Sequence, residues 1–198
     1  MNETYYRYFI LYKPVNMLSQ FVGAEVGPFL GDLGFKFPEG SHAIGRLDKE
    51  SEGLLLVCTN KKVTKLLFES KVPHRRTYLV QVLQKMTPET LQKLREGVSI
   101  RIGIEDYWTT SPCEAEIIDK PSNLAVLENE LKDFIPQTWL RITLTEGKFR
   151  QVRKMVFTLR HKCRRLIRES IEGLNINEMS AGDVREISEE DFFTLLKL

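Results

Sequence analysis

The sequence has few of the residues that build disulfide frameworks or metal sites. Its 198 residues include only three cysteines, an odd number, and three histidines. Neither set shows the close spacing of a disulfide scaffold, a CxxC pair or a zinc site. We therefore expect buried, reduced cysteines, a cytoplasmic location, no metal and no other cofactor.

Long apolar runs are also missing. Residues 54–58 (LLLVC) are uninterrupted by polar side chains, but a membrane helix needs about 20 such residues. The N-terminus carries an acid at Glu3 and lacks the basic and apolar regions of a secretory signal, so we expect no membrane partner. The length, the absence of repeats and the ordinary composition predict a single domain over residues 1–198, long enough to form two lobes.

Acidic residues are absent from one long stretch, although the net charge of the chain is only +2. Residues 148–168 contain nine lysines and arginines and no aspartate or glutamate. Such a run is typical either of a solvated helix face or of a surface that contacts nucleic-acid phosphates. The charge pattern alone leaves these two interpretations nearly even.

Hydrophobic periodicity predicts more strands than helices. Residues 139–145 alternate between apolar and polar side chains, and Thr87, Pro88 and Gly97 carry the start and stop signals of a helix. A second helix over 149–159 should bury one stripe and expose a basic face. Further strands are expected at 6–12, 43–47, 54–59, 77–83, 98–102, 113–118, 164–167 and 184–187, further helices at 61–69 and 189–196, and a loop with one short helix at 21–40. Because this order does not repeat a βαβ unit, we predict an α+β fold with a mixed, mainly antiparallel central sheet flanked by helices.

Three segments combine ionisable and aromatic residues in patterns that suit chemistry. Residues 45–53 (GRLDKESEG) place Asp48 on a loop at the end of a strand, where a carboxylate can act as a nucleophile, although a charged turn is the commoner explanation. Residues 75–78 (RRTY) offer the ring of Tyr78 for stacking beside two cations. Residues 146–155 (EGKFRQVRKM) lead from a glycine turn into a helix whose free amides favour phosphate and whose arginines could hold a carboxylate.

Taken in this order and spacing, the three segments resemble the RsuA-like family of ribosomal RNA pseudouridine synthases. The resemblance covers essentially the whole chain and begins with a Lys-Pro pair at residues 13–14. Residues 135–140 (IPQTWL) most resemble the large-subunit pseudouridine synthase E subgroup. The family often carries an N-terminal S4 RNA-binding module, and none is expected here. The chain also has Arg160 and Glu172 where the family commonly has glycine.

The resemblance implies a fold with a catalytic cleft and a role for each matched residue. Asp48 would be the nucleophile, Tyr78 would stack on a uridine flipped out of its helix, and Arg153 would pair with Asp48. No cofactor is implied, and the partner would be structured ribosomal RNA, expected to be that of the large subunit (23S). We expect a monomer. The residues expected to contact RNA are Lys13, Arg46, Lys148, Arg150, Gln151 and Lys154.

Two other functions fit parts of the pattern. A non-catalytic RNA-binding or ribosome assembly factor would need the cations but not an acid at Asp48, so Asp48, Tyr78 and Arg153 together favour an enzyme. A glycosidase would pair Asp48 with a second carboxylate about 5–10 Å away. A glycosidase has no need of the basic helix.

Overall fold

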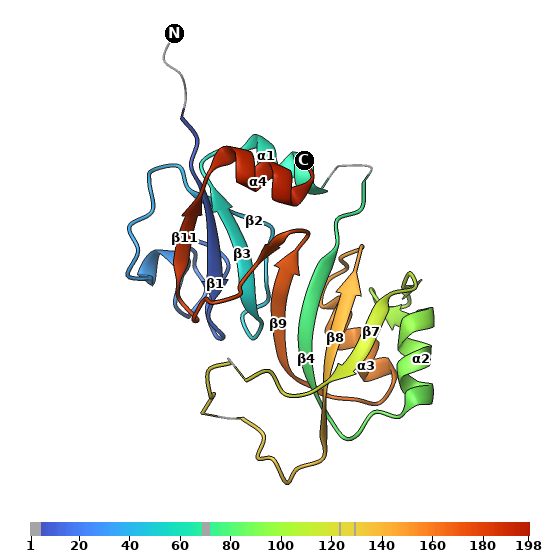
Figure 1. Cartoon of the computed structure of the whole chain (residues 1–198). Helices are drawn as coiled ribbons and strands as arrows, with labels where there is room; N and C mark the ends of the chain where they lie inside the picture. The colour runs from blue at the N-terminus through green and yellow to red at the C-terminus, as the bar shows by residue number, and fades with distance from the viewer. Residues whose placement is uncertain (1–4, 69–71, 123, 129) are drawn as a thin grey trace. The chain divides into compact units, whose positions relative to one another are not determined.

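The computed structural model describes residues 5–68, 72–122, 124–128 and 130–198. Residues 1–4, which were expected to carry no secretory signal, and Glu69, the expected end of a helix, lie outside this part of the chain. The chain divides into two compact units, Met1–His74 with Arg168–Leu198 and Arg75–Ile167 (Figure 1). Within the described ranges, no helix is long and apolar enough to cross a membrane.

The first unit is built on an antiparallel sheet in which β1 pairs with both β3 and β11. The short strand β2 also pairs with β3, and β10 pairs with β9. Residues 168–171 of β9 belong to this unit, whereas residues 163–167 belong to the other. Its elements are β1 (Tyr8–Lys13), the 3-10 helix η1 (Leu30–Asp32), β2 (His42–Ile44), β3 (Glu52–Cys58), α1 (Lys62–Phe68), β9 (Cys163–Ile171) in part, β10 (Leu174–Asn175), β11 (Val184–Ile187) and α4 (Glu189–Leu196).

Aromatic packing holds the long 21–40 segment against this sheet. Phe9 of β1 is fully buried, and its ring centroid lies 5.6 Å from that of Phe35 and 5.7 Å from that of Phe37. The ring of Phe21 packs edge-on against Phe37 at 5.1 Å. Burying one such ring stabilises a fold by about 1.5–3 kcal/mol. The segment was expected to be a loop with one short helix, and its only regular element in the described chain is η1.

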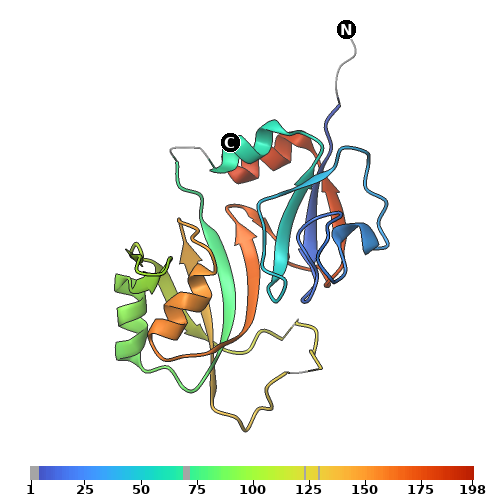
Figure 2. The same ribbon diagram turned by 180° about the vertical axis from the view of Figure 1, so that it is seen from behind.

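The second unit is a curved sheet with two helices, seen from behind in Figure 2, and its four strands follow the order β9 (residues 163–167), β4, β8 and β7. Strand β8 lies between β4 and β7, and a separate hairpin of β5 and β6 adjoins α3. Its elements are β4 (Arg76–Leu83), α2 (Pro88–Glu96), β5 (Ser99–Arg101), β6 (Tyr107–Thr109), β7 (Glu114–Ile118), β8 (Gln137–Leu144), α3 (Gln151–Thr158) and residues 163–167 of β9.

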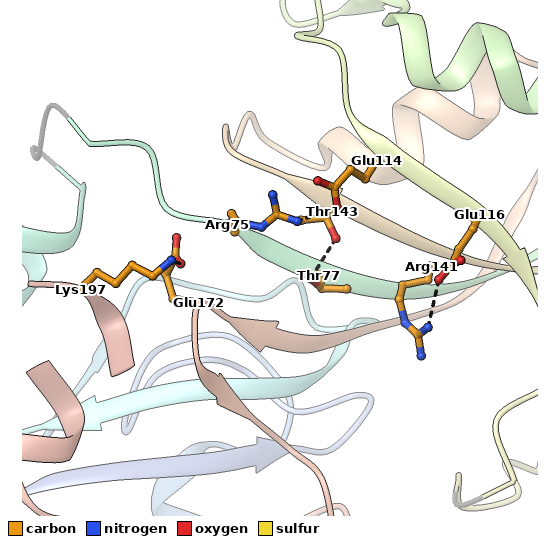
Figure 3. Close-up of polar contacts among 8 residues, drawn as sticks. All are labelled: Arg75, Thr77, Glu114, Glu116, Arg141, Thr143, Glu172 and Lys197. Carbon is orange, nitrogen blue, oxygen red and sulfur yellow. Dashed lines mark hydrogen bonds and ion pairs between the residues drawn. The ribbon is translucent and has the colours of Figure 1, made fainter. Parts of the chain in front are cut away.

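Strand alternation gives the second sheet one apolar and one largely polar face. Val80, Leu140 and Ile142 are fully buried in a core shared with Val156 of α3, and Tyr78 packs against that core. The opposite face carries polar contacts between neighbouring strands and, from Arg75 to Glu114, across β8 (Figure 3). These contacts are Thr77–Thr143 at 3.0 Å, Arg75–Glu114 at 2.5 Å and Arg141–Glu116 at 3.0 Å.

The predicted α+β class and mainly antiparallel sheet are confirmed. The alternation of residues 139–145 and the basic face of the helix near 149–159 are also confirmed. The hairpin strand β6 was not predicted. Arg160 and Glu172, which replace glycines common in the family, both adopt left-handed conformations, with φ of 63° and 48°. Glycine adopts this region without the cost that a side chain carries.

Candidate active site

Asp48 lies on the tight turn that joins β2 to β3 in the first unit. Its carbonyl oxygen accepts a hydrogen bond from the Ser51 amide at 3.0 Å, which closes the turn. The preceding residue is held from both sides, because the buried Ser19 hydroxyl accepts from the Leu47 amide at 3.0 Å and donates to the Leu47 carbonyl at 2.8 Å. The half-buried carboxyl group of Asp48 therefore projects from a backbone that is fixed by hydrogen bonds.

Lys13 is buried beneath this turn and does not lie at the surface. Its Nζ donates to the carbonyl oxygens of Met17 at 2.7 Å, Pro14 at 2.8 Å and Lys49 at 3.4 Å. The side chain is fully buried. The expected contact of Lys13 with RNA stays a prediction, and in this structure its Nζ is occupied by these carbonyl oxygens. Its ammonium ties the end of β1 to the residue that follows Asp48.

Burial lowers the pKa of Lys13 to about 8. The negative charges of Glu52, Asp48 and Glu50 act in the opposite direction and raise this pKa. The loss of hydration outweighs the attraction of the carboxylates. Glu52 is itself buried, and the Tyr12 hydroxyl donates to its Oε2 at 3.4 Å. The turn that carries Asp48 is thus supported by buried charges of both signs.

The depressed pKa of Lys13 predicts a specific pH dependence of stability. Between pH 8 and 10.5 the unfolded chain holds a proton on Lys13 that the folded protein has lost, so the free energy of unfolding rises with pH. Between pH 8 and pH 10.5, the free energy of unfolding of the wild-type protein should rise by about 3 kcal/mol relative to that of Lys13→Met. Urea denaturation at several pH values measures the gain. Exposed Lys36, in the same unit, gives the control Lys36→Met, and parallel curves for wild type and Lys13→Met would contradict the prediction.

Tyr78 lies in the second unit, on β4. It pairs in register with Ile142 and is half-buried, with its ring against the apolar core. The neighbouring Arg76 is buried. A half-buried ring on a strand with a neighbour on each side has a fixed orientation, which suits a residue that stacks on a base.

The turn before α3 is organised by Gln151 rather than by a side-chain cap. Gln151 is buried, accepts from the Lys148 amide at 2.8 Å and donates to Glu146 Oε1 at 2.7 Å. The RNA contact expected of Gln151 stays a prediction, and in this structure its amide is occupied in holding the turn. Arg150 precedes the helix in a left-handed conformation, with φ of 54°.

Arg153 and Lys154 project from the basic face of α3. The guanidinium of Arg153 donates from Nη1 to Cys163 Sγ at 3.6 Å. Both residues line a shallow groove together with Phe157. Of the predicted RNA-contacting residues, Arg46 and Lys148 are exposed, and Arg150 and Lys154 are half-exposed.

The basic run between residues 148 and 168 is not one continuous surface. Arg165 is buried and donates to the carbonyl of Ala125 at 2.9 Å, and buried Arg168 donates to the carbonyl of Leu54 at 2.7 Å. These two arginines serve the packing of the backbone. The part of the run that is available to a ligand is therefore the basic face of α3 together with the exposed cations Lys148, Arg160, Lys162 and Arg164.

The structure assigns the predicted catalytic residues to different units. Asp48 and Arg46 come from one turn of the first unit, and Tyr78, Arg153 and the cations around α3 come from the second. The pairing of Arg153 with Asp48 stays a prediction. Sequence reasoning missed Ser19 and Trp108, although the aromatic pair at 107–108 beyond Gly103 is a signal of a hairpin strand.

Two of the three cysteines have little reactivity in this environment. All three are free, and Cys58 is buried as expected, but Cys113 and Cys163 are only half-buried. Burial raises the pKa of Cys58 and of Cys113 to about 11, so both thiols are protonated at neutral pH. Among the described residues, no cluster of three or more His, Cys, Asp or Glu side chains could hold a metal ion.

Comparison with known proteins gives a consistent family. A family model described as RNA pseudouridylate synthase matches residues 7–157. Ribosomal large subunit pseudouridine synthase E of Vibrio vulnificus (strain CMCP6) is 36% identical over 183 residues, which cover 90% of this chain and 74% of the relative. Ribosomal large subunit pseudouridine synthase B of Bacillus subtilis (strain 168) is 28% identical and covers 91% and 68%. A crystal structure of a pseudouridylate synthase shares the fold, with a TM-score of 0.77 at 23% identity over 98% of this chain and 76% of that one.

Proposed function

We propose, from the premise that the chain belongs to the RNA pseudouridylate synthase family, that it isomerises a uridine of large-subunit ribosomal RNA to pseudouridine. The observation that carries this proposal is the family match over residues 7–157, a span that includes Asp48, Tyr78 and Arg153. Relatives named for the large subunit, at 32–36% identity, support the choice of substrate. We also propose that the protein acts as a monomer in the cytoplasm.

The proposed reaction moves the glycosidic bond within one nucleotide. The bond between the sugar carbon and N1 of uracil breaks, the base turns, and a bond forms between the same sugar carbon and C5. The proton lost from C5 is balanced by one gained at N1, so the product has the composition of the substrate. No oxidant, reductant or energy source is needed.

Asp48 is proposed as the nucleophile that allows the base to detach. The support comes from its place on a turn fixed by Ser19, Ser51 and buried Lys13, because a nucleophile must be held in its reactive geometry. Tyr78 is proposed to stack on the flipped uracil, and Arg153 to pair with Asp48 and favour its ionised form. Arg46, Lys148, Arg150 and Lys154 are proposed to contact phosphates.

Mapping of pseudouridine in ribosomal RNA tests this proposal. RNA from cells that lack the protein should lose one or more pseudouridines of the large subunit, and expression of the wild-type chain should restore them. Purified protein should introduce the same modification into transcribed ribosomal RNA. A deletion strain that keeps every pseudouridine would contradict the proposed substrate.

A further inference from the structure

Exposed aromatic rings alternate with cations around the start of α3 and the β5–β6 hairpin. Phe149 and Phe157 are 74% and 73% exposed, and Trp108 is 37% exposed. We call these three rings, with Lys148 and Lys154, the aromatic–cation band. All five residues belong to the second unit. Large rings left in water at adjacent positions mark a surface that binds something.

The rings and cations of the band are in mutual contact. Lys148 Nζ lies 4.0 Å from the centroid of the Trp108 ring, and Lys154 Nζ lies 5.3 Å from that of Phe149. Lys154 also lines the shallow groove with Phe157. Each ammonium therefore lies beside a ring, so that a phosphate on the cation would bring its base close to a π-face.

Trp108 is held in a fixed orientation. Its Nε1 donates to Glu146 Oε2 at 3.2 Å, and Glu146 Oε1 accepts from the Ser111 amide at 3.0 Å and from Gln151 at 2.7 Å. The carboxylate of Glu146 is thus engaged by groups of the protein. A ring fixed in advance loses little conformational entropy when a ligand stacks on it.

The groove at the far end of the band has the chemistry of a nucleotide site. It is lined by four cations, one phenyl ring and one thiol, and none of the described residues that line it is acidic. These residues are Arg150, Arg153, Lys154, Phe157, Lys162 and Cys163. Positive charge around an apolar ring complements a base attached to a phosphate.

We propose that the aromatic–cation band binds an unpaired stretch of the substrate RNA, with bases stacked on its rings and phosphates on Lys148 and Lys154. The proposal rests on the proposed function for the identity of the ligand, and it adds a requirement for unpaired nucleotides besides the uridine that reacts. Bases inside an A-form helix are stacked on each other and cannot cover a protein ring, whereas splayed bases can. A surface that needed only phosphates would have no use for three exposed rings.

Equilibrium binding of three fluorescent probes tests the band. The probes are an unstructured oligouridylate of about 12 nucleotides, a fully paired RNA hairpin of similar charge, and heparin, a polyanion without bases. Phe157→Leu and Trp108→Leu should each weaken oligouridylate binding about tenfold, as expected for the loss of one stacked base, and change the other two affinities less than about twofold. Lys154→Gln should weaken all three and reduce their salt dependence.

The matched control is Tyr5→Ala. Tyr5 is an exposed aromatic of the first unit that shares a pocket with the acids Glu186 and Glu189, and its removal should leave all three affinities unchanged. The proposal would be overturned if the ring variants bound oligouridylate with the wild-type affinity. It would also be overturned if they lost affinity for the hairpin and for heparin as much as for oligouridylate. Because binding is measured without turnover, a failure to form pseudouridine would refute the proposed function and leave this result intact.

Discussion

The Asp48→Asn variant should form pseudouridine at least about a thousandfold more slowly than the wild-type protein. The amide keeps the shape of the carboxylate but lacks the negative oxygen that attacks, and loss of a covalent nucleophile is among the largest single-residue effects in catalysis. The backbone of the turn should be unaffected, because its hydrogen bonds to Ser51 and Ser19 involve main-chain atoms of Asp48 and Leu47. Quantification of pseudouridine in ribosomal RNA over single-turnover time courses measures the effect.

A neighbouring carboxylate provides the control for Asp48. Glu50 is exposed on the same turn, so Glu50→Gln removes an equal charge without removing the proposed nucleophile. This variant should keep its rate within a few fold of the wild type, and both variants should bind RNA with nearly the wild-type affinity. Substantial turnover by Asp48→Asn, or an equal loss in Glu50→Gln, would show that the nucleophile lies elsewhere.

The second large effect is expected from Gly53→Ala, which should destabilise the protein by about 3–5 kcal/mol. Gly53 has a φ of 103°, a conformation that L side chains rarely adopt. A Cβ atom there would lie 2.3 Å from the carbonyl oxygen and 2.7 Å from the amide nitrogen of Arg168, both of which are backbone atoms. The clash can be relieved only by separating β3 from the part of β9 in the same unit.

Urea denaturation of Gly53→Ala should show a much lower midpoint than that of the wild-type protein. Gly34 is the matched control, since an added Cβ meets no atom within 4 Å and its backbone is not left-handed. Gly34→Ala should change stability by less than about 0.5 kcal/mol. A Gly53→Ala variant as stable as Gly34→Ala would mean that β3 and β9 do not approach as closely as described.

Local sequence signals predicted the regular elements well where neighbouring residues decide the structure. Helix α2 is an example, because Thr87 accepts a hydrogen bond from the Thr90 amide at 3.2 Å, Pro88 is the first helical residue, and Gly97 follows the end with a φ of 101°. The alternation in β8 likewise depends on period alone. These features involve residues only a few positions apart.

The sequence could not show which cations would be buried. Arg165 finds its partner 40 positions away at Ala125, and Arg168 finds one 114 positions away at Leu54. A lysine or arginine is buried when backbone carbonyl oxygens far away in the sequence accept its hydrogen bonds. No local sequence pattern shows where those carbonyl groups will lie. For the same reason the three segments around Asp48, Tyr78 and Arg153 suggested a site only as a set, and the resemblance to a family supplied their roles.

The order of the two units along the chain has a consequence for synthesis on the ribosome. The second unit is one uninterrupted segment, whereas the first needs both ends of the chain. Strand β1 cannot pair with β11, nor the ring of Tyr8 pack at 4.7 Å on Phe192, until residues 184–192 have been translated. The second unit, although it begins later in the chain, can therefore complete its sheet first. Until β11 is made, one edge of β1 in the nascent chain stays unpaired and can form hydrogen bonds with the wrong strand.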